Sequence, residues 1–271
     1  MTPAQDIRRF IKTGDRDLLY SSCSGGTFLE KAQRADLELR TALIQEVKRR
    51  AAGRTPPPVP EGQDAGQFVL SRVTPMVRGL FPAKEQQVIL DLLEKGLLFV
   101  SHENIDSLIH EIQATNSAWD IANLYLGSLD LPGLDGKPAK AVGFSEGPTF
   151  YVSTTYFQDK DPFADWVVHE AAHVFHNWKR KMVGLPHTRK REFLLPVAFR
   201  KRELFAYACE AYARIVERAK GKADRLRLHQ EFAAHWSPLS DEPDLDGLND
   251  VLAEAVAARN GWKRILQRCS A

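Results

Sequence analysis

Two histidines and a glutamate lie together in an otherwise apolar stretch of the chain. Residues 166–175 read WVVHEAAHVF, and the only polar side chains among them are His169, Glu170 and His173. Burying a polar group without a partner costs about 2–7 kcal/mol, and burying a charge costs more. A divalent metal ion removes this cost because imidazole nitrogens bind it directly. The stretch therefore predicts a metal site.

The spacing of these residues suits a single ion. Positions i and i+4 of a helix are about 40° apart around its axis, so His169 and His173 project from one face. Zinc accepts nitrogen and oxygen ligands and, in catalytic sites, keeps one position for water, whose pKa it lowers. Glu170 follows the first histidine directly, where its carboxylate can take a proton from that water. We therefore expect Zn²⁺ as the cofactor and Glu170 as the general base.

The helix that carries the motif has predictable ends. Asp161 and Pro162 are typical of an N-cap and a first helical position. Gly184 and Pro186 are typical of residues that follow a helix. These signals predict a helix over residues 162–182, with the metal-binding motif near its middle.

A catalytic zinc ion needs a third protein ligand, for which three residues compete. Glu203 opens a helical run, ELFAYACEAY, whose small residues allow close approach of another helix. Glu210, seven residues later on nearly the same face, is an alternative ligand or an acceptor that orients an imidazole. His187, fourteen residues after His173, is the third candidate. His176 is expected beside the metal and not on it.

The HExxH helix, followed about thirty residues later by the ELFAYACEAY run, resembles the gluzincin metallopeptidases. It looks most like the branch that contains the anthrax lethal-factor catalytic domain and, more loosely, the ImmA/IrrE-type intracellular proteases. The resemblance covers about residues 140–216. It implies that His169, His173 and Glu203 bind zinc and that Glu170 is the general base in peptide hydrolysis.

The chain departs from this family at two positions. Tyr207 stands where the family often has an acidic residue, four positions after the ligand. Pro196 lies in the stretch where the family has a tyrosine, so the resemblance assigns no donor to stabilise an oxyanion. Tyr207 is our first candidate for that catalytic role. Three other residues are further candidates: Tyr212, His176 and His187.

Other interpretations remain open. The position of His187 resembles the third ligand of the SprT/Spartan group of DNA-associated proteases, although Thr188 follows it where that group usually has glycine. A second alternative, of another class, is a zinc-stabilised binding or regulatory module without turnover. The missing family tyrosine supports that alternative. A third is a helical adaptor without metal.

The expected fold is α+β and predominantly α-helical: a zincin-like catalytic domain with a small mixed β-sheet and zinc between two helices. Residues 143–153, with aromatic and β-branched side chains, predict a strand whose free edge can accept a substrate backbone. The proline-rich segment 54–60 predicts a boundary between a helical arm over residues 1–55 and a metallopeptidase domain over residues 64–271.

Periodicity predicts the remaining elements. Residues 121–129 are ambiguous, and their alternation permits a strand. A short strand is expected over residues 97–100. Helices are expected over residues 4–13, 27–52, 83–95, 103–113, 198–219, 222–235 and 245–267.

Composition bounds the partners and the compartment. The 271 residues are 44% hydrophobic and 27% charged, with a net charge of +2, which implies no global polyelectrolyte partner. The three cysteines form no zinc-knuckle or redox motif, and no apolar signal segment or membrane span is evident. We expect a cytoplasmic protein, with signal-less secretion as an effector left open, no membrane partner, and a protein or peptide substrate.

A basic segment lies between the two expected metal helices, over residues 179–202. Such clusters bind phosphates or acidic peptides, although many are solvated helix ends. An acidic or nucleic-acid-associated partner is therefore a further hypothesis. The segment contains Lys179, Arg180, Lys181, Arg189, Lys190, Arg191, Arg200, Lys201 and Arg202.

Overall fold

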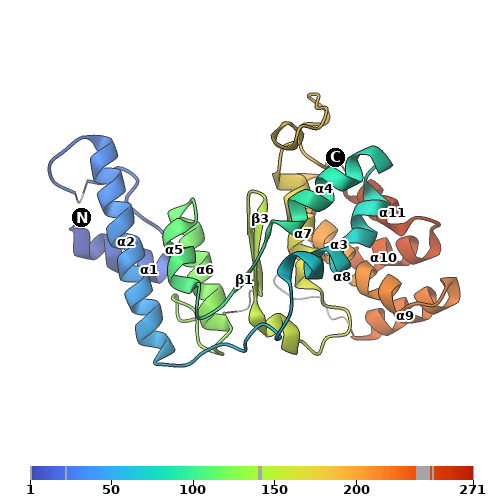
Figure 1. Ribbon diagram of the computed structural model, residues 1–271, viewed down its shortest axis with the longest axis horizontal. Coiled ribbons are helices and arrows are strands. Elements are labelled where there is room, and N and C mark those ends of the chain that lie inside the picture. The colour runs from blue at the N-terminus through green and yellow to red at the C-terminus, as the bar shows by residue number, and fades with distance from the viewer. Residues whose placement is uncertain (1, 22, 140–141, 236–244, 246, 271) are drawn as a thin grey trace. The chain divides into compact units, whose positions relative to one another are not determined.

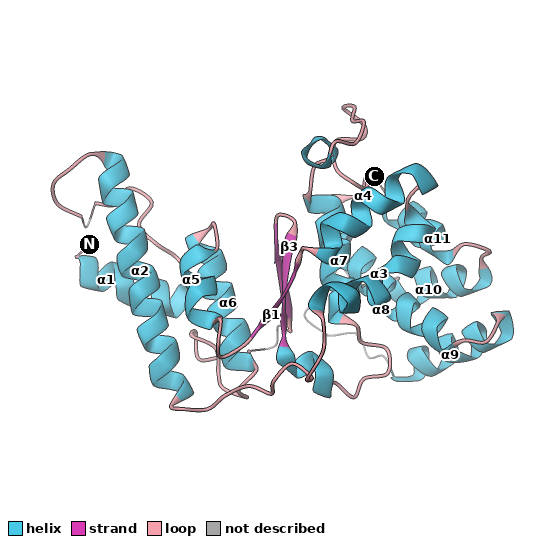
Figure 2. Ribbon diagram, in the orientation of Figure 1, coloured by secondary structure: helices cyan, strands magenta, loops and turns pink. Residues whose placement is uncertain are grey.

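The computed structural model describes residues 2–21, 23–139, 142–235, 245 and 247–270 (Figure 1). The chain is α+β and mostly helical, with one small sheet, as Figure 2 shows. It divides into two compact units. Unit 1 contains residues 1–61, 99–144 and 151–158, and unit 2 contains residues 62–98, 145–150 and 159–271.

Unit 1 is built on the long helix α2 (Phe28–Ala51), which packs against α1 (Pro3–Thr13), α5 (Ile105–Glu111) and α6 (Thr115–Gly127). Both α1 and α2 begin with a capping box, in which a threonine side chain and a residue three positions on exchange hydrogen bonds. A single apolar cluster joins the four helices; its fully buried members include Phe10, Leu43, Ile109 and Ile121. The 3₁₀ helix η1 (Thr154–Gln158) also belongs to this unit.

One sequence prediction changes in unit 1. Residues 121–129, for which a strand was permitted, lie mainly in α6, because a helix buries Ile121, Leu124 and Tyr125 in the same cluster. Residues of the predicted N-terminal arm, 1–55, belong to one compact unit with residues 99–144. The helices α5 and α6 pack against α2 and bury its apolar face, which would otherwise be exposed to water.

Unit 2 contains the remaining α-helices of the described chain. Within it, α3, α7 and α8 pack against one another, and α11 packs against α3 and α8. The approach of α3 to α11 is close enough that a Cβ on Gly79 would lie 2.1 Å from the ring of Trp262. The helices are α3 (Ala65–Leu80), α4 (Ala83–Glu94), α7 (Trp166–Asn177), α8 (Arg202–Arg218), α9 (Lys222–His235), α10 (Leu248–Ala257) and α11 (Gly261–Cys269). The 3₁₀ helices are η2 (Arg180–Val183) and η3 (Phe199–Lys201).

Two helix predictions in this unit need correction, and one helix was not predicted. The helix predicted over residues 245–267 is two helices, because Asn260 caps a new start: its side chain accepts a hydrogen bond from the Lys263 amide at 3.1 Å. The helix expected over residues 162–182 covers only Trp166–Asn177. No helix was predicted over α3, which contains Pro75 in its interior.

The sheet has three strands in the order β1-β3-β2, formed by β1 (Leu97–Val100), β2 (Gly143–Glu146) and β3 (Thr149–Ser153). The strand predicted over residues 143–153 is therefore a pair of strands joined by a two-residue turn. Gly147 occupies this turn with φ +62°, a conformation that favours glycine. β2 is an edge strand of the sheet, and the strand predicted over residues 97–100 is confirmed.

Candidate metal centre

The first turn of α7 is set by Asp165. Its buried side chain accepts a hydrogen bond from the Val168 amide at 3.3 Å, which is the geometry of an N-cap. Asp161, the N-cap predicted from the sequence, instead accepts from the Phe163 amide at 2.8 Å in a local turn. The helix consequently begins at Trp166, and the HExxH motif lies near its middle.

Helices α7 and α8 pack against each other, and each carries buried small residues. Ala171 and Ala172 of α7, and Ala206 and Ala208 of α8, are all fully buried. Alanine side chains let helix axes approach closely, so a short side chain on one helix can reach groups on the other. The N-terminal turn of α8 thus brings Glu203 to the face of α7 that carries the histidines.

Three side chains from the two helices converge on one point. Nε2 of His173 lies 3.1 Å from Nε2 of His169. Oε2 of Glu203 lies 3.5 Å from Nε2 of His173 and 3.8 Å from Nε2 of His169. Tetrahedral zinc with bonds near 2.0–2.1 Å separates its ligand atoms by roughly 3.3 Å. The residues present therefore fit a single ion of this kind, and they form the one possible metal-binding cluster of His, Cys, Asp and Glu side chains found among the described residues.

His169 is oriented by Glu210, which lies about two helical turns beyond Glu203 on α8. Nδ1 of His169 lies 2.9 Å from Oε2 of Glu210, whose Oε1 accepts the Asp165 amide at 2.7 Å. An ionised carboxylate only accepts hydrogen bonds, so Nδ1 carries the proton and Nε2 presents its lone pair to the cluster. Glu210 therefore lies on the opposite side of the imidazole from Glu203, the position of an orienting acceptor.

The surroundings of His169 favour positive charge. Burial lowers the pKa of His169, but the hydrogen bond and charge of Glu210 and the charges of Glu170 and Glu203 outweigh it, so the pKa is raised. The carboxylates thus create a place that stabilises a proton or a metal cation between the helices.

His173 is oriented through a second chain of hydrogen bonds. Its Nδ1 lies 3.0 Å from Nε2 of His176, whose Nδ1 lies 3.2 Å from Oδ1 of Asn177. That oxygen also accepts from Nη1 of Arg202 at 3.2 Å. Burial, with the charges of His173 and Arg202, lowers the pKa of His176 to about 3, so His176 is neutral at physiological pH. Neutral His176 donates to Asn177 and accepts from His173, which leaves Nε2 of His173 facing the cluster.

Glu170 lies directly beside the cluster and is only 5% exposed. Burial raises the pKa of its carboxyl, while the neighbouring histidines and a hydrogen bond from Ser145 oppose the rise. A carboxylate with a raised pKa accepts a proton more readily near neutral pH, as a general base must. The cluster is open on one side, since the Glu203 side chain is 50% exposed.

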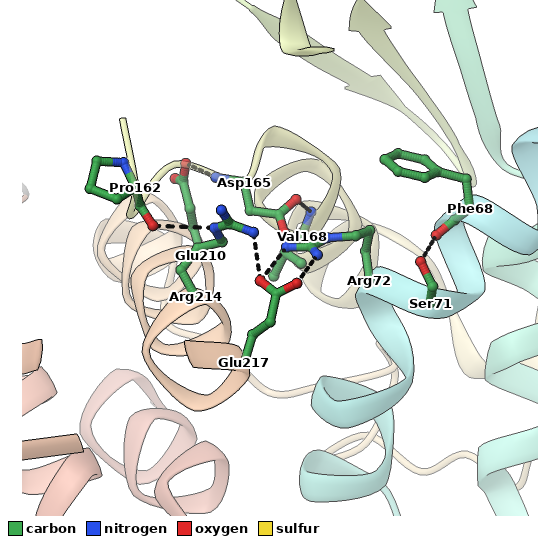
Figure 3. A network of polar contacts seen from close by, with 9 residues as sticks. All are labelled: Phe68, Ser71, Arg72, Pro162, Asp165, Val168, Glu210, Arg214 and Glu217. Carbon is green, nitrogen blue, oxygen red and sulfur yellow. Dashed lines mark hydrogen bonds and ion pairs between the residues drawn. The ribbon is translucent and has the colours of Figure 1, made fainter. Parts of the chain in front are cut away.

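A polar network fixes the start of α7 to its neighbours (Figure 3). Asp165 is fully buried and accepts from Nε of Arg72, on α3, at 2.8 Å. Arg72 also pairs with Glu217 of α8, and Arg214 joins Glu217 to the Pro162 carbonyl. Because Glu210 accepts the Asp165 amide, the network continues to His169. The sequence interpretation missed Asp165 and Arg72, although an aspartate directly before an apolar helical run is a start signal.

The other candidate residues lie away from the cluster or beside it. The Tyr207 ring packs edge-on against the His169 ring, with centroids 4.5 Å apart. Tyr212 is buried against Trp262, and its hydroxyl accepts from Arg225. His187 is exposed and is not part of the cluster. The structure therefore brings Glu203, and not His187, to the two motif histidines.

Three cations of the basic segment over residues 179–202 form local ion pairs. Arg180 is fully buried and pairs with Glu85 at 2.7 Å, and Arg191 lies 3.6 Å from the same carboxylate. Lys179 pairs with Glu192 at 2.7 Å. These pairs weaken the hypothesis that the whole segment is a continuous anion-binding surface, since neutralised cations contribute little to such a field.

No family model, curated protein or solved structure matches this chain. Within the described ranges, the helices are all too short or too polar to cross a membrane.

Proposed function

We propose that the chain is a zinc-dependent metallopeptidase with a zincin-like catalytic unit formed around α7 and α8. The observation that supports this most strongly is the convergence of Nε2 of His169, Nε2 of His173 and a carboxylate oxygen of Glu203 on one point, with buried Glu170 alongside. A zinc ion bound there supplies Lewis acidity, which lowers the pKa of water and polarises a carbonyl group.

The chain's own residues divide the remaining tasks. Glu210 and His176 hold the two imidazoles with their Nε2 atoms toward the cluster. Glu170, kept in place by Ser145, accepts a proton from the attacking water and passes it to the leaving amine. Tyr207, beside His169, is the proposed donor to the developing oxyanion.

The openness of the site favours catalysis over a purely structural zinc module. Structural zinc sites are closed by four protein ligands, whereas catalytic sites use three and leave a position for water or substrate. This cluster has three members, and one of them is half exposed. The non-catalytic module remains the second candidate function. The DNA-associated alternative loses its distinguishing support, because His187 lies outside the cluster.

The test combines metal analysis with a cleavage assay. Purified wild-type protein is expected to contain one equivalent of zinc by elemental analysis and to cleave an unfolded protein such as reduced, carboxymethylated casein. Chelation should abolish cleavage, and stoichiometric zinc should restore it. Bound zinc without cleavage across about pH 6–9 would favour the non-catalytic module, and the lack of zinc would refute both.

A further inference from the structure

One cation beside the cluster has no carboxylate partner. Arg202 is the first residue of α8 and directly precedes Glu203. Other cations of the same basic segment, such as Lys179 and Arg180, are paired with glutamates. Among the described residues, the Arg202 guanidinium forms no ion pair; it donates to a neutral amide oxygen and lies over an aromatic ring.

The guanidinium is nevertheless held in a defined place. Nη1 donates to Oδ1 of Asn177 at 3.2 Å, and the group lies over the Phe199 ring, 4.9 Å from its centroid. Phe199 itself is 79% exposed, although it is a large apolar side chain. Arginine stacked on an aromatic ring has fewer accessible conformations, so less freedom is lost when it binds a ligand.

Arg202 also carries an unused donor. Its Nε–H is buried and has no hydrogen-bond partner. A buried donor without an acceptor is destabilising, and native structures pair most of them. An arginine fork matches a carboxylate, which accepts two parallel hydrogen bonds, and a shift of the side chain that exposes the Nε–H would let a carboxylate satisfy it. The exposed ring of Phe199 offers an apolar surface next to it.

We propose that Arg202 is a specificity-determining residue that binds a carboxylate of the substrate close to the scissile bond. The proposal rests on the proposed peptidase function, and it follows from the position of Arg202 next to Glu203, from its freedom from ion pairs and from its stacking on Phe199. The carboxylate belongs to an acidic side chain or to the free end of the peptide. Both groups are carboxylates, and the experiments below distinguish a side-chain carboxylate from a terminal one.

The first experiment needs neither zinc nor turnover. The Nε–H signal of Arg202 in a ¹H–¹⁵N spectrum is assigned by its loss in Arg202→Lys. N-acetylglutamate amide carries only a side-chain carboxylate, N-acetylalanine only a terminal one, and N-acetylalanine amide neither. A concentration-dependent shift with an acidic probe, and none with the neutral amide, supports the proposal. A larger response to inorganic phosphate at equal concentration would instead indicate a phosphate site and overturn it.

The second experiment reads specificity from cleavage. Zinc-loaded wild type digests a random octapeptide library, and mass spectrometry gives the residues on either side of each cut. We expect enrichment of Asp and Glu at one position, or cuts at a fixed distance from a free C-terminus that disappear when the library is amidated. Arg202→Gln should reduce this preference at least about tenfold in relative kcat/KM. Arg202→Lys should retain part of it, because the charge stays and the planar fork is lost.

The matched control is Arg200→Gln, which removes an exposed cation of the same segment two residues away. It should leave the preference unchanged. An equal loss in both variants would show a general field effect and overturn the assignment to Arg202. Zinc content and the thermal unfolding midpoint of each variant exclude a folding defect. If wild type cleaves nothing, the proposed function fails, and the Nε–H titration alone decides whether Arg202 binds carboxylates.

Discussion

Oε2 of Glu210 lies 2.9 Å from Nδ1 of His169, on the side of the imidazole that faces away from Glu203. The two glutamates of α8 thus lie near different ring nitrogens of the same histidine. One nitrogen is held protonated by Glu210, and the other is left to bind a cation. Under the proposed function, this division lets one helix supply both a metal ligand and the group that orients another ligand.

Replacing Glu210 by glutamine should weaken zinc binding without removing the site. The introduced amide keeps the shape of the side chain and one acceptor, but it loses the charge that stabilises a cation near His169. We expect zinc affinity to fall about 10–100-fold, as for other groups that orient a metal ligand. Competition with a chromophoric chelator measures the change. An unchanged affinity would show that Glu210 contributes only packing.

Glu203→Ala and His187→Ala distinguish the two candidate third ligands. Loss of Glu203 should remove the carboxylate from the cluster and reduce bound zinc to substoichiometric levels after dialysis. Loss of the exposed His187 should leave zinc at one equivalent. Elemental analysis of the two proteins, purified in parallel, gives the answer. The reverse pattern would restore the DNA-associated interpretation.

Glu170→Gln should separate metal binding from catalysis. Glutamine has nearly the same volume but cannot accept a proton, so zinc is expected to remain while kcat falls about 10²–10⁴-fold. His169→Ala, in contrast, should lose both zinc and turnover, because it removes a ligand. Cleavage at the wild-type rate by Glu170→Gln is the result that contradicts the mechanism.

The buried pair of Arg72 and Asp165 should matter for stability. Arg72→Met removes the cation that pairs with the fully buried Asp165 carboxylate, and breaking such a pair typically costs about 3–5 kcal/mol. Urea denaturation of the variant should show this loss. The double variant Arg72→Met/Asp165→Asn should recover part of it, because no uncompensated charge remains. Equal stability of the single and double variants would argue against this account.

Acid should weaken unit 1 through Glu46. Hydrogen bonds from Arg49 and then Arg50, opposed by burial, lower the pKa of Glu46 from 4.5 to about 2. A lowered folded-state pKa means that Glu46 stabilises the fold fully above its unfolded-state pKa of 4.5, and that this contribution is lost as the pH falls toward 2. The free energy of unfolding of Glu46→Gln, measured from about pH 6 down to about pH 2.5, should therefore fall less steeply than that of wild type.

Much of the site was predictable because it depends on local spacing. His169 and His173 share a face by helix geometry alone, and Glu170 must lie beside them. The hypothesis that Glu203 approaches them rested on small residues in a second helical run, and the buried alanines of α7 and α8 agree with it. The start of α7 was harder to predict, because Asp161 and Asp165 are both typical N-cap residues. Only the packing of the folded chain selects between them.

The sequence by itself determined the helical character of the chain, the pair of imidazoles with their adjacent carboxylate, and the two helices that carry the site, because these follow from residue type and periodicity. Only the tertiary structure decided which distant groups meet them. Glu203 faces the cluster while Glu210 holds the far side of His169, and Arg72 reaches Asp165 from α3, for which no helix was predicted. The physical reason is that such contacts depend on how whole helices pack, and a choice between two acids on one helical face is set by the partner helix and not by spacing along the chain.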